Sequence, residues 1–294
     1  MFEQTLEFFQ QFPTAFNIFV VIFSLMIGSF LNVVVYRLPK MMHNGWYLEC
    51  REFLADEVTN IPAKEFEHIT LSKPDSTCPK CGHKIRFYEN IPVINWLFLQ
   101  GKCSQCKNSI SFRYPLVESA TALLSLVIAN QFGVSIETLL LLILTWALIC
   151  LTLIDFDHML LPDQIVMPLL WLGLLVNINT TFVPLSDAVI GAAVGYMSLF
   201  SVFWVFKLLT GKEGMGHGDF KLFALFGAWL GWQLLPILIL MASVVGAVVG
   251  ISLMLFKNHQ REQAIPFGPY LAVAGWITLL WGEGIWSWYL LQIS

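Results

Sequence analysis

Long apolar runs separated by short polar segments cover most of this chain. The first run lies at residues 14–36, and seven more follow a long polar stretch, at 116–133, 138–156, 165–182, 187–207, 220–233, 235–256 and 267–291. About 20 consecutive apolar residues cross the hydrocarbon core of a bilayer as one helix. The pattern therefore predicts an all-α polytopic membrane protein with about eight transmembrane helices.

The run at 220–233 is short for a spanning helix. Trp232, Gln233 and Pro236, which lie at its end, indicate either a tight turn or a kink inside one longer helix, because proline interrupts helical hydrogen bonding. The number of predicted helices depends on this segment.

Basic residues are concentrated in one part of the chain. Eleven of the sixteen Lys and Arg residues lie between Arg37 and Arg113, and the other five are Lys207, Lys212, Lys221, Lys257 and Arg261. Positively charged loops stay in the cytoplasm, so residues 37–113 are expected inside and the N-terminus outside. With eight helices, every Lys and Arg then lies at or near the cytoplasmic face, which supports counting 220–233 as a separate helix.

Composition agrees with a membrane location. Apolar residues make up 57% of the chain and charged residues only 12%, which is far from ordinary globular usage. A net charge of −4 excludes the strongly basic balance of a nucleic-acid-binding protein. The first twelve residues contain Glu3 and Glu7 but no basic residue, unlike a cleavable signal peptide, so the first helix is expected to stay in the mature protein.

Four cysteines form two Cys-x-x-Cys pairs within the polar stretch: Cys78, Cys81, Cys103 and Cys106. Four thiolates can hold Zn²⁺ tetrahedrally, and a small polar module needs such a cross-link to fold. Two disulfides are the alternative, which a reducing cytosol disfavours. Because four thiolates leave no open position for a water, the zinc is predicted to be structural.

The predicted organisation follows from the helices and the cysteines together. Residues 1–36 form the N-terminus and first transmembrane helix, and residues 37–113 form a small cytoplasmic four-cysteine zinc module inserted after it. Residues 114–294 form a seven-helix membrane domain.

Two carboxylates at the predicted cytoplasmic ends of helices are the candidate catalytic groups. Asp155 lies in the last turn of the third predicted helix, and Asp219 opens the sixth, after Gly216 and Gly218. Ionisable groups near a membrane are costly and mark candidate functional sites. Two adjacent carboxylates share one proton, so one can activate a water as a base while the other donates a hydrogen bond to a peptide carbonyl. Glycine at the two flanking positions lets the backbone approach a substrate strand closely.

Other polar residues near this pair have simpler interpretations. Asp157 lies about 200° around a helix from Asp155, so the two cannot face one partner. Asp163 is expected to cap the following helix, and Asp219 could also be a cap. Two loop histidines are expected to be solvated or hydrogen-bonded: His158 and His217.

Six motifs occur in order along the chain: GSFLNVVVYRLP at 28–39, CPKCGHKIRFYENIPVINWL at 78–97, GKCSQCK at 101–107, RYPLVE at 113–118, LIDFDHMLLPD at 153–163 and GHGDFKLFA at 216–224. Together they make nearly the whole chain resemble the bacterial type IV prepilin peptidases, membrane aspartic proteases of the Gly-x-Gly-Asp class. In that family an Asp precedes a Leu/Ile-Pro pair by six residues, which implies that Asp155 and Asp219 are the catalytic pair.

The resemblance also implies a substrate and a second activity. Such enzymes cleave the short basic leader of type IV prepilins and type II secretion pseudopilins at the cytoplasmic side of the bacterial inner membrane. The N-terminus, expected outside from the charge pattern, would then lie in the periplasm. Many members with the four-cysteine module also methylate the new N-terminal amine using S-adenosylmethionine, so both activities are expected here. No glycine-rich Rossmann fingerprint identifies the methyl-donor site.

Two polar residues of the first predicted helix are candidates for contacts near the site. Asn32 is equally typical of a helix–helix hydrogen bond. Arg37 is equally typical of an anchor whose charge reaches the membrane surface.

A proton-coupled membrane transporter with a structural zinc module is the alternative function, because membrane carboxylates also relay ions. In that case Asn in place of either aspartate would leave prepilin processing intact. A zinc protease is disfavoured, since the sequence has no HExxH pair and the cysteines leave no open metal position.

Overall fold

The computed structural model describes residues 2–54, 69–256 and 265–293. In these ranges the regular elements are all helices, accompanied by two isolated β-bridges. The chain divides into two compact units, Met1–Trp146 and Ala147–Ser294.

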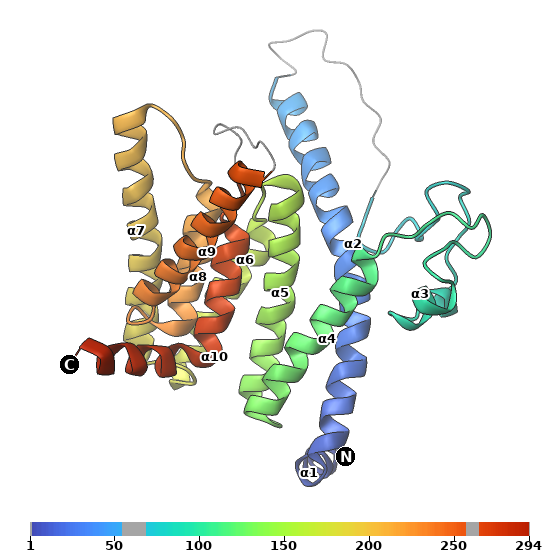
Figure 1. The fold of residues 1–294 in the computed structure, drawn as a ribbon, viewed down its shortest axis with the longest axis horizontal. Helices are drawn as coiled ribbons and strands as arrows, with labels where there is room; N and C mark the ends of the chain where they lie inside the picture. Colours follow the sequence, from blue (N-terminus) through green and yellow to red (C-terminus); the bar gives the residue numbers. More distant parts are fainter. Residues whose placement is uncertain (1, 55–68, 257–264, 294) are drawn as a thin grey trace. The chain divides into compact units, whose positions relative to one another are not determined.

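The helices follow one another along both units (Figure 1). The first unit contains α1 (Phe2–Gln11), α2 (Pro13–Phe53), η1 (Phe87–Asn90), α3 (Ile94–Phe98), α4 (Arg113–Phe132) and the first part of α5 (Ile136–His158). The second unit contains the rest of α5, then α6 (Asp163–Val176), η2 (Asn177–Asn179), α7 (Leu185–Thr210), α8 (His217–Leu230), α9 (Leu235–Phe256) and α10 (Gly268–Ile293).

Five of the described helices are long and apolar enough to cross a membrane: α2, α4, α5, α7 and α9. Helix α6 is apolar but shorter. The prediction of an all-helical, multi-pass membrane protein is therefore confirmed, whereas eight spans are not established. Lys257 and Arg261, two of the charges used for the predicted topology, lie outside the described residues.

Helix boundaries differ from the apolar runs in two places. Helix α2 has 41 residues and continues to Phe53, through Pro39, although its apolar run ends at residue 36. Helical hydrogen bonding does not require apolar side chains, so the end of the run did not mark the end of the helix. Helices α8 and α9 are separated at Gly231, which has φ +74° and donates its N–H to the Gly227 carbonyl. The interpretation of this region as a tight turn is thus confirmed.

Helix α8 forms the centre of the second unit. It packs against α6, α7, α9 and α10, and nearly all of its side chains from Asp219 onward are buried. A helix that is apolar on every side belongs in a protein interior. Its position explains why a segment of only 14 residues carries so many bulky apolar side chains.

Glycines on the surrounding helices make room for α8. A side chain at Gly191 of α7 would overlap the backbone of Gly227, so α7 and α8 are in direct backbone contact. Small residues allow such close approach between membrane helices. Two bulky side chains of α8 lie opposite glycines of other helices: Trp229 opposite Gly173 of α6 and Phe226 opposite Gly275 of α10.

In the first unit, α2 and α4 lie side by side (Figure 1). They run in opposite directions, because Asn17 pairs with Asn130 near one end and Asn32 reaches the Tyr114 carbonyl near the other. At Gly28 the two backbones nearly touch, since a Cβ there would lie 2.7 Å from the Cα of Glu118.

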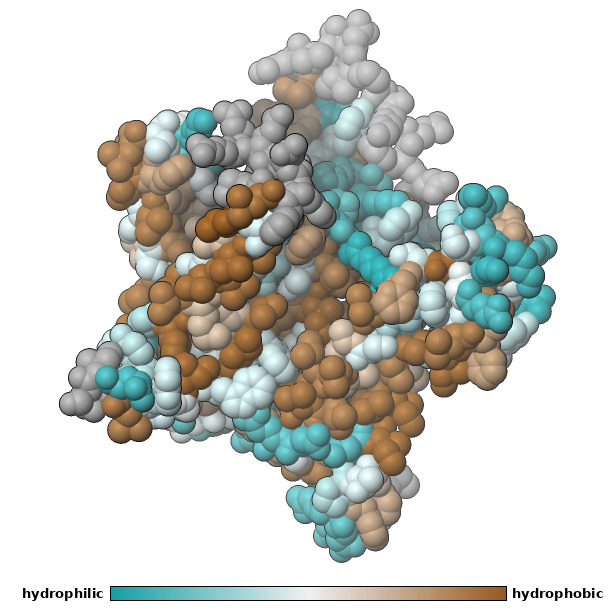
Figure 2. Space-filling model, viewed as in Figure 1, coloured by the Kyte–Doolittle hydropathy of each residue, from teal (hydrophilic) through white to brown (hydrophobic). Residues whose placement is uncertain are grey.

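Apolar side chains face outward over the helices of both units. On the face shown in Figure 2, hydrophobic residues cover much of the helical surface, and hydrophilic residues gather on the cysteine-bearing segment and at the ends of helices. Exposed apolar residues include Leu123, Leu139, Val205, Leu240 and Val248. Apolar surface of this extent is typical of helices that face lipid.

Candidate active site and four-cysteine cluster

Asp155 and Asp219 both lie in the second unit, and both are buried. Asp155 is in the last turn of α5 and is 5% exposed, and Asp219 is in the first turn of α8 and is 6% exposed. Leu161 lies between their segments, because it contacts both Gly218, the residue before Asp219, and Gly268, which faces the Asp155 carboxylate. The fold therefore brings together two acidic groups that come from separate parts of the sequence.

The carboxylate of Asp155 faces the beginning of α10. The backbone amide of Gly268 interacts with it, and a Cβ placed on Gly268 would lie 2.5 Å from Asp155 Oδ2. Within the described residues, Oδ2 has no hydrogen-bond partner. A buried carboxylate oxygen without a partner is costly, so this atom has the capacity to accept a further hydrogen bond. Gly268 was not predicted, although a glycine before a proline at the start of an apolar run is a recognisable helix-start signal.

The carboxylate of Asp219 accepts a hydrogen bond from the backbone N–H of Gly216, at 3.2 Å. Gly216 immediately precedes α8, so the contact also helps to satisfy the free amides at the helix start. A negative charge in the first turn is favoured by the helix dipole. Asp219 thus has the position of a helix-start residue as well as that of a partner for Asp155.

Three nearby polar residues are exposed, unlike the two acids. Asp157 and His158 at the end of α5 are exposed. His217 is also exposed, and its ring packs against Phe203 and Phe220, with centroids 5.1 and 5.4 Å away.

The expected capping role of Asp163 is wrong. Asp163 is the first residue of α6, Pro162 occupies the cap position, and no side chain caps this helix. Instead, the Asp163 carboxylate pairs with Lys221 of α8 at 2.6 Å. Lys221 lies on another helix, two residues after Asp219. Its ammonium group competes with the backbone amides of α6 for the Asp163 carboxylate. The sequence around Asp163 does not reveal this partner.

The two glycines before Asp219 have different surroundings. A Cβ at Gly218 would lie 2.8 Å from the Cβ of Leu161, so glycine is required there by packing. A Cβ at Gly216 would meet only Asp219 Oδ2, at an ordinary 3.6 Å. Close packing against the α5–α6 connection therefore accounts for one of the two glycines.

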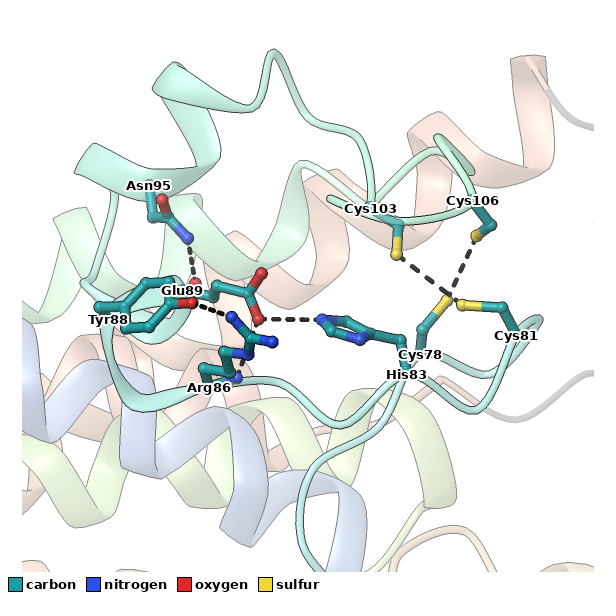
Figure 3. Close-up of polar contacts among 9 residues, drawn as sticks. All are labelled: Cys78, Cys81, His83, Arg86, Tyr88, Glu89, Asn95, Cys103 and Cys106. Carbon is teal, nitrogen blue, oxygen red and sulfur yellow. Dashed lines mark hydrogen bonds and ion pairs between the residues drawn. The ribbon is translucent and has the colours of Figure 1, made fainter.

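The four cysteines lie together in the first unit (Figure 3). All four Sγ atoms are within 4.8 Å of one another, and those of Cys78 and Cys106 are 3.7 Å apart. Zn–S bonds of about 2.3 Å in a tetrahedron give sulfur–sulfur distances of about 3.8 Å, whereas a disulfide needs about 2.05 Å. The cluster could hold a metal ion, and the disulfide alternative does not fit.

The two Cys-x-x-Cys segments have the same local structure. Each first cysteine accepts an N–H from four residues later and donates its own N–H to a carbonyl five residues later: Gly82 and His83 for Cys78, and Lys107 and Asn108 for Cys103. Backbone amides of Cys81 and Lys80 lower the pKa of the Cys78 thiol to about 6. Those of Cys106 and Gln105 lower the pKa of Cys103 in the same way. The backbone amides therefore favour the thiolate form, which is the form that binds metal, at both first cysteines.

Glu89 lies next to the cysteine cluster and contacts His83 (Figure 3). Its Oε2 accepts the backbone N–H of Arg86 at 2.9 Å and lies 3.1 Å from His83 Nε2. The amide of Arg86 and the side chain of Ser104 lower the pKa of Glu89 to about 2, with a further contribution from His83. His83 is thus paired with a carboxylate and not a free surface histidine, and Glu89 links the two cysteine segments. Sequence reasoning did not single out Glu89.

The two polar residues of α2 have structural partners. Asn32 donates to the Tyr114 carbonyl of α4 at 3.3 Å, which confirms the helix–helix hydrogen bond. Arg37 is buried and donates to carbonyls of the segment that leads to the cysteines: Thr70, Leu71 and Pro74. Arg37 thus has hydrogen-bond partners in a distant segment of the chain, which were not predicted.

Comparison with known proteins covers almost the whole chain. Residues 22–132 match the bacterial peptidase A24 N-terminal domain, and residues 142–251 match the type IV leader peptidase family. Proteins named prepilin leader peptidase/N-methyltransferase are similar to it: that of Aeromonas salmonicida is 54% identical over 288 residues, 98% of each chain. Those of Pseudomonas aeruginosa and Legionella pneumophila are 53% and 43% identical over 97% and 95% of this chain, and 97% and 96% of their own. No solved structure matches the chain significantly. Identity at this level over the full length of the relatives means that the chain belongs to the type IV leader peptidase family.

Proposed function

We propose that this protein removes the basic leader of type IV prepilins and type II secretion pseudopilins, and then methylates the new N-terminal amine. The relatives that are similar over their full length carry both activities in their name. The observation that carries the proteolytic part is the pair of buried acids, Asp155 and Asp219, whose segments both pack against Leu161 within one unit.

The two carboxylates have different roles in the proposed cleavage reaction. Two acids that share one catalytic site hold one proton between them. The ionised member takes a proton from a water, which attacks the scissile carbonyl, while the protonated member donates a hydrogen bond to the carbonyl oxygen and then protonates the leaving amine. Oδ2 of Asp155, which lacks a described partner, is the atom proposed to contact the water.

Zinc is the proposed metal of the four-cysteine cluster. The sulfur spacing suits a tetrahedral ion of this size. Because four thiolates complete the coordination shell, the metal stabilises the segment and takes no direct part in proteolysis. S-adenosylmethionine is the proposed methyl donor.

We further propose the membrane arrangement derived from charge. Eight spans, with the N-terminus in the periplasm, put the acid pair at the cytoplasmic face of the inner membrane. A prepilin leader with Lys or Arg stays on that side by the same rule, so its cleavage site and the acid pair would lie at one depth in the lipid bilayer. The buried positions of both acids near helix ends suit such a boundary.

The direct test is to mix membranes containing this protein with a type IV prepilin and to follow the substrate by mass spectrometry. We expect loss of the leader and then addition of one methyl group when S-adenosylmethionine is supplied. A proton-coupled transporter, the alternative, would leave the prepilin intact and show a proton flux in proteoliposomes.

A further inference from the structure

The start of α10 is built around the carboxylate of Asp155. We infer that Gly268 is a positioning residue for cleavage: its amide interacts with the Asp155 carboxylate, and its missing side chain lets this carboxylate keep its position against the start of α10. This inference rests on the proposed proteolytic function and adds a residue that acts through Asp155.

The space at Gly268 leaves no room for a side chain. A Cβ there would lie 2.5 Å from Asp155 Oδ2, 3.2 Å from Asp155 Cγ and 3.2 Å from Leu161 Cδ1. Real Cβ atoms essentially never approach another atom within 3.0 Å. Gly268 is not among the described glycines with positive φ, so the requirement for glycine comes from the neighbouring carboxylate and not from the backbone conformation.

The amide of Gly268 is also singled out by the hydrogen bonding of the first turn. Pro269 has no N–H, and the amides of Tyr270 and Leu271 both donate to the carbonyl of Phe267. Gly268 therefore carries the amide of this turn that is directed to the Asp155 carboxylate. The partial positive charge of a helix start adds to this attraction.

A side chain at residue 268 would displace the Asp155 carboxylate and not helix α10. Helix α10 is fixed by buried residues that follow immediately, Leu271, Ala272 and Ala274, and it packs against α8 and α9. The Asp155 carboxyl group, in contrast, can turn about its own side-chain bonds. An added methyl group at residue 268 is therefore expected to rotate the carboxylate away from the amide and to leave the helices in place.

The test is Gly268→Ala, with Gly284→Ala as the matched control on the same helix. A Cβ at Gly284 meets nothing within 4 Å. For Gly268→Ala we expect kcat for prepilin cleavage to fall about 100-fold, because misplacing a catalytic group by about 1 Å has an effect of this order. KM is expected to stay unchanged, since substrate binding is retained. Thermal stability and methylation of a pre-cleaved peptide should match those of wild type.

A double variant separates positioning from packing. Leu161→Ala removes the second contact of the added methyl group but not the clash with Oδ2. If Gly268 matters only for packing, the double variant should cleave prepilin as fast as the Leu161→Ala single variant. If Gly268 positions Asp155, cleavage stays low.

Two results would overturn the inference: a Gly268→Ala variant with wild-type kcat, or one that loses thermal stability and methylation together with cleavage and regains all three with Leu161→Ala. In both cases wild type still cleaves, so the proposed function survives. A wild-type protein that leaves the prepilin uncut would refute the proposed function itself.

Discussion

Glu118 on α4 accepts the backbone N–H of Val93 at 2.7 Å and so ties the cysteine-bearing segment to the α2–α4 pair. Val93 has φ +58°, a conformation that is costly for a β-branched residue. Glu118 is itself buried, beside the close approach of α2 at Gly28. Its carboxylate therefore holds an unfavourable backbone turn in place.

Replacement of this carboxylate should weaken the first unit. Glu118→Ala leaves the Val93 amide without its acceptor, which costs about 1–3 kcal/mol. Differential scanning calorimetry, with zinc release followed in parallel, checks this. Glu52→Ala, at an exposed position of α2, is the control. Equal thermal midpoints for the two variants would contradict the role given to Glu118.

Metal content tests the cysteine cluster. The wild-type protein should contain about one zinc per chain, because four thiolates fill one tetrahedral shell. Cys106→Ser removes one of the four clustered thiols and should lower the zinc content severalfold by atomic absorption. Cys50→Ser, outside the cluster, should keep the wild-type content. A wild-type protein without zinc after purification in metal-containing buffer would argue against the site.

The two cysteine segments have a left-handed residue at the same position, which is glycine in one segment and lysine in the other. This difference predicts how substitutions there change stability. Gly82 has φ +68° and its counterpart Lys107 has φ +59°, a left-handed conformation that costs a residue with a Cβ about 1 kcal/mol. Lys107→Gly should therefore stabilise the segment by about 0.5–1 kcal/mol, and Gly82→Ala should destabilise it by a similar amount. Zinc release during urea titration measures both. Shifts in the same direction for the two variants would contradict this account.

The lowered pKa of Glu89 predicts how its contribution to folding stability depends on pH. Its folded-state pKa is lowered to about 2, so its stabilising effect is complete above the unfolded value and is lost only as the pH falls through the folded value. In a His83→Asn background, which removes the imidazole beside this carboxylate, the stability cost of Glu89→Gln should thus be constant from about pH 8 to about pH 5. Thermal melts across this range provide the measurement. A difference that changes near neutral pH would mean that another group carries the effect.

The apolar runs predicted the helices well because burial in lipid or in a protein core imposes the same composition. All seven runs after residue 113 correspond to described helices. Helix α1 and the second half of α2 were not predicted, since their sequences carry many polar residues. The number of spans cannot be read from apolarity alone, because α8 is apolar through burial inside the second unit.

The sequence predicted which chemical groups form the candidate site but not which contacts surround them. Carboxylates and cysteines stand out in the sequence, so Asp219 and the four cysteines were proposed from their motifs, and the family resemblance favoured Asp155 over Asp157. Gly268 and the salt bridge between Asp163 and Lys221 depend on which helices become neighbours, and local sequence does not carry that information. Arg37 shows the same limit, since its acceptors lie more than thirty residues away.

The most direct test of the account compares prepilin cleavage by Asp155→Asn, Asp219→Asn and Asp157→Asn in the same membranes. Asparagine keeps the shape of each side chain but cannot accept the proton. We predict that the first two variants lose about 1000-fold in kcat, as expected for removal of a general acid or base, while they still methylate a pre-cleaved peptide. The exposed Asp157 should be replaceable without loss. Cleavage near the wild-type rate by either of the first two variants would contradict the catalytic pair.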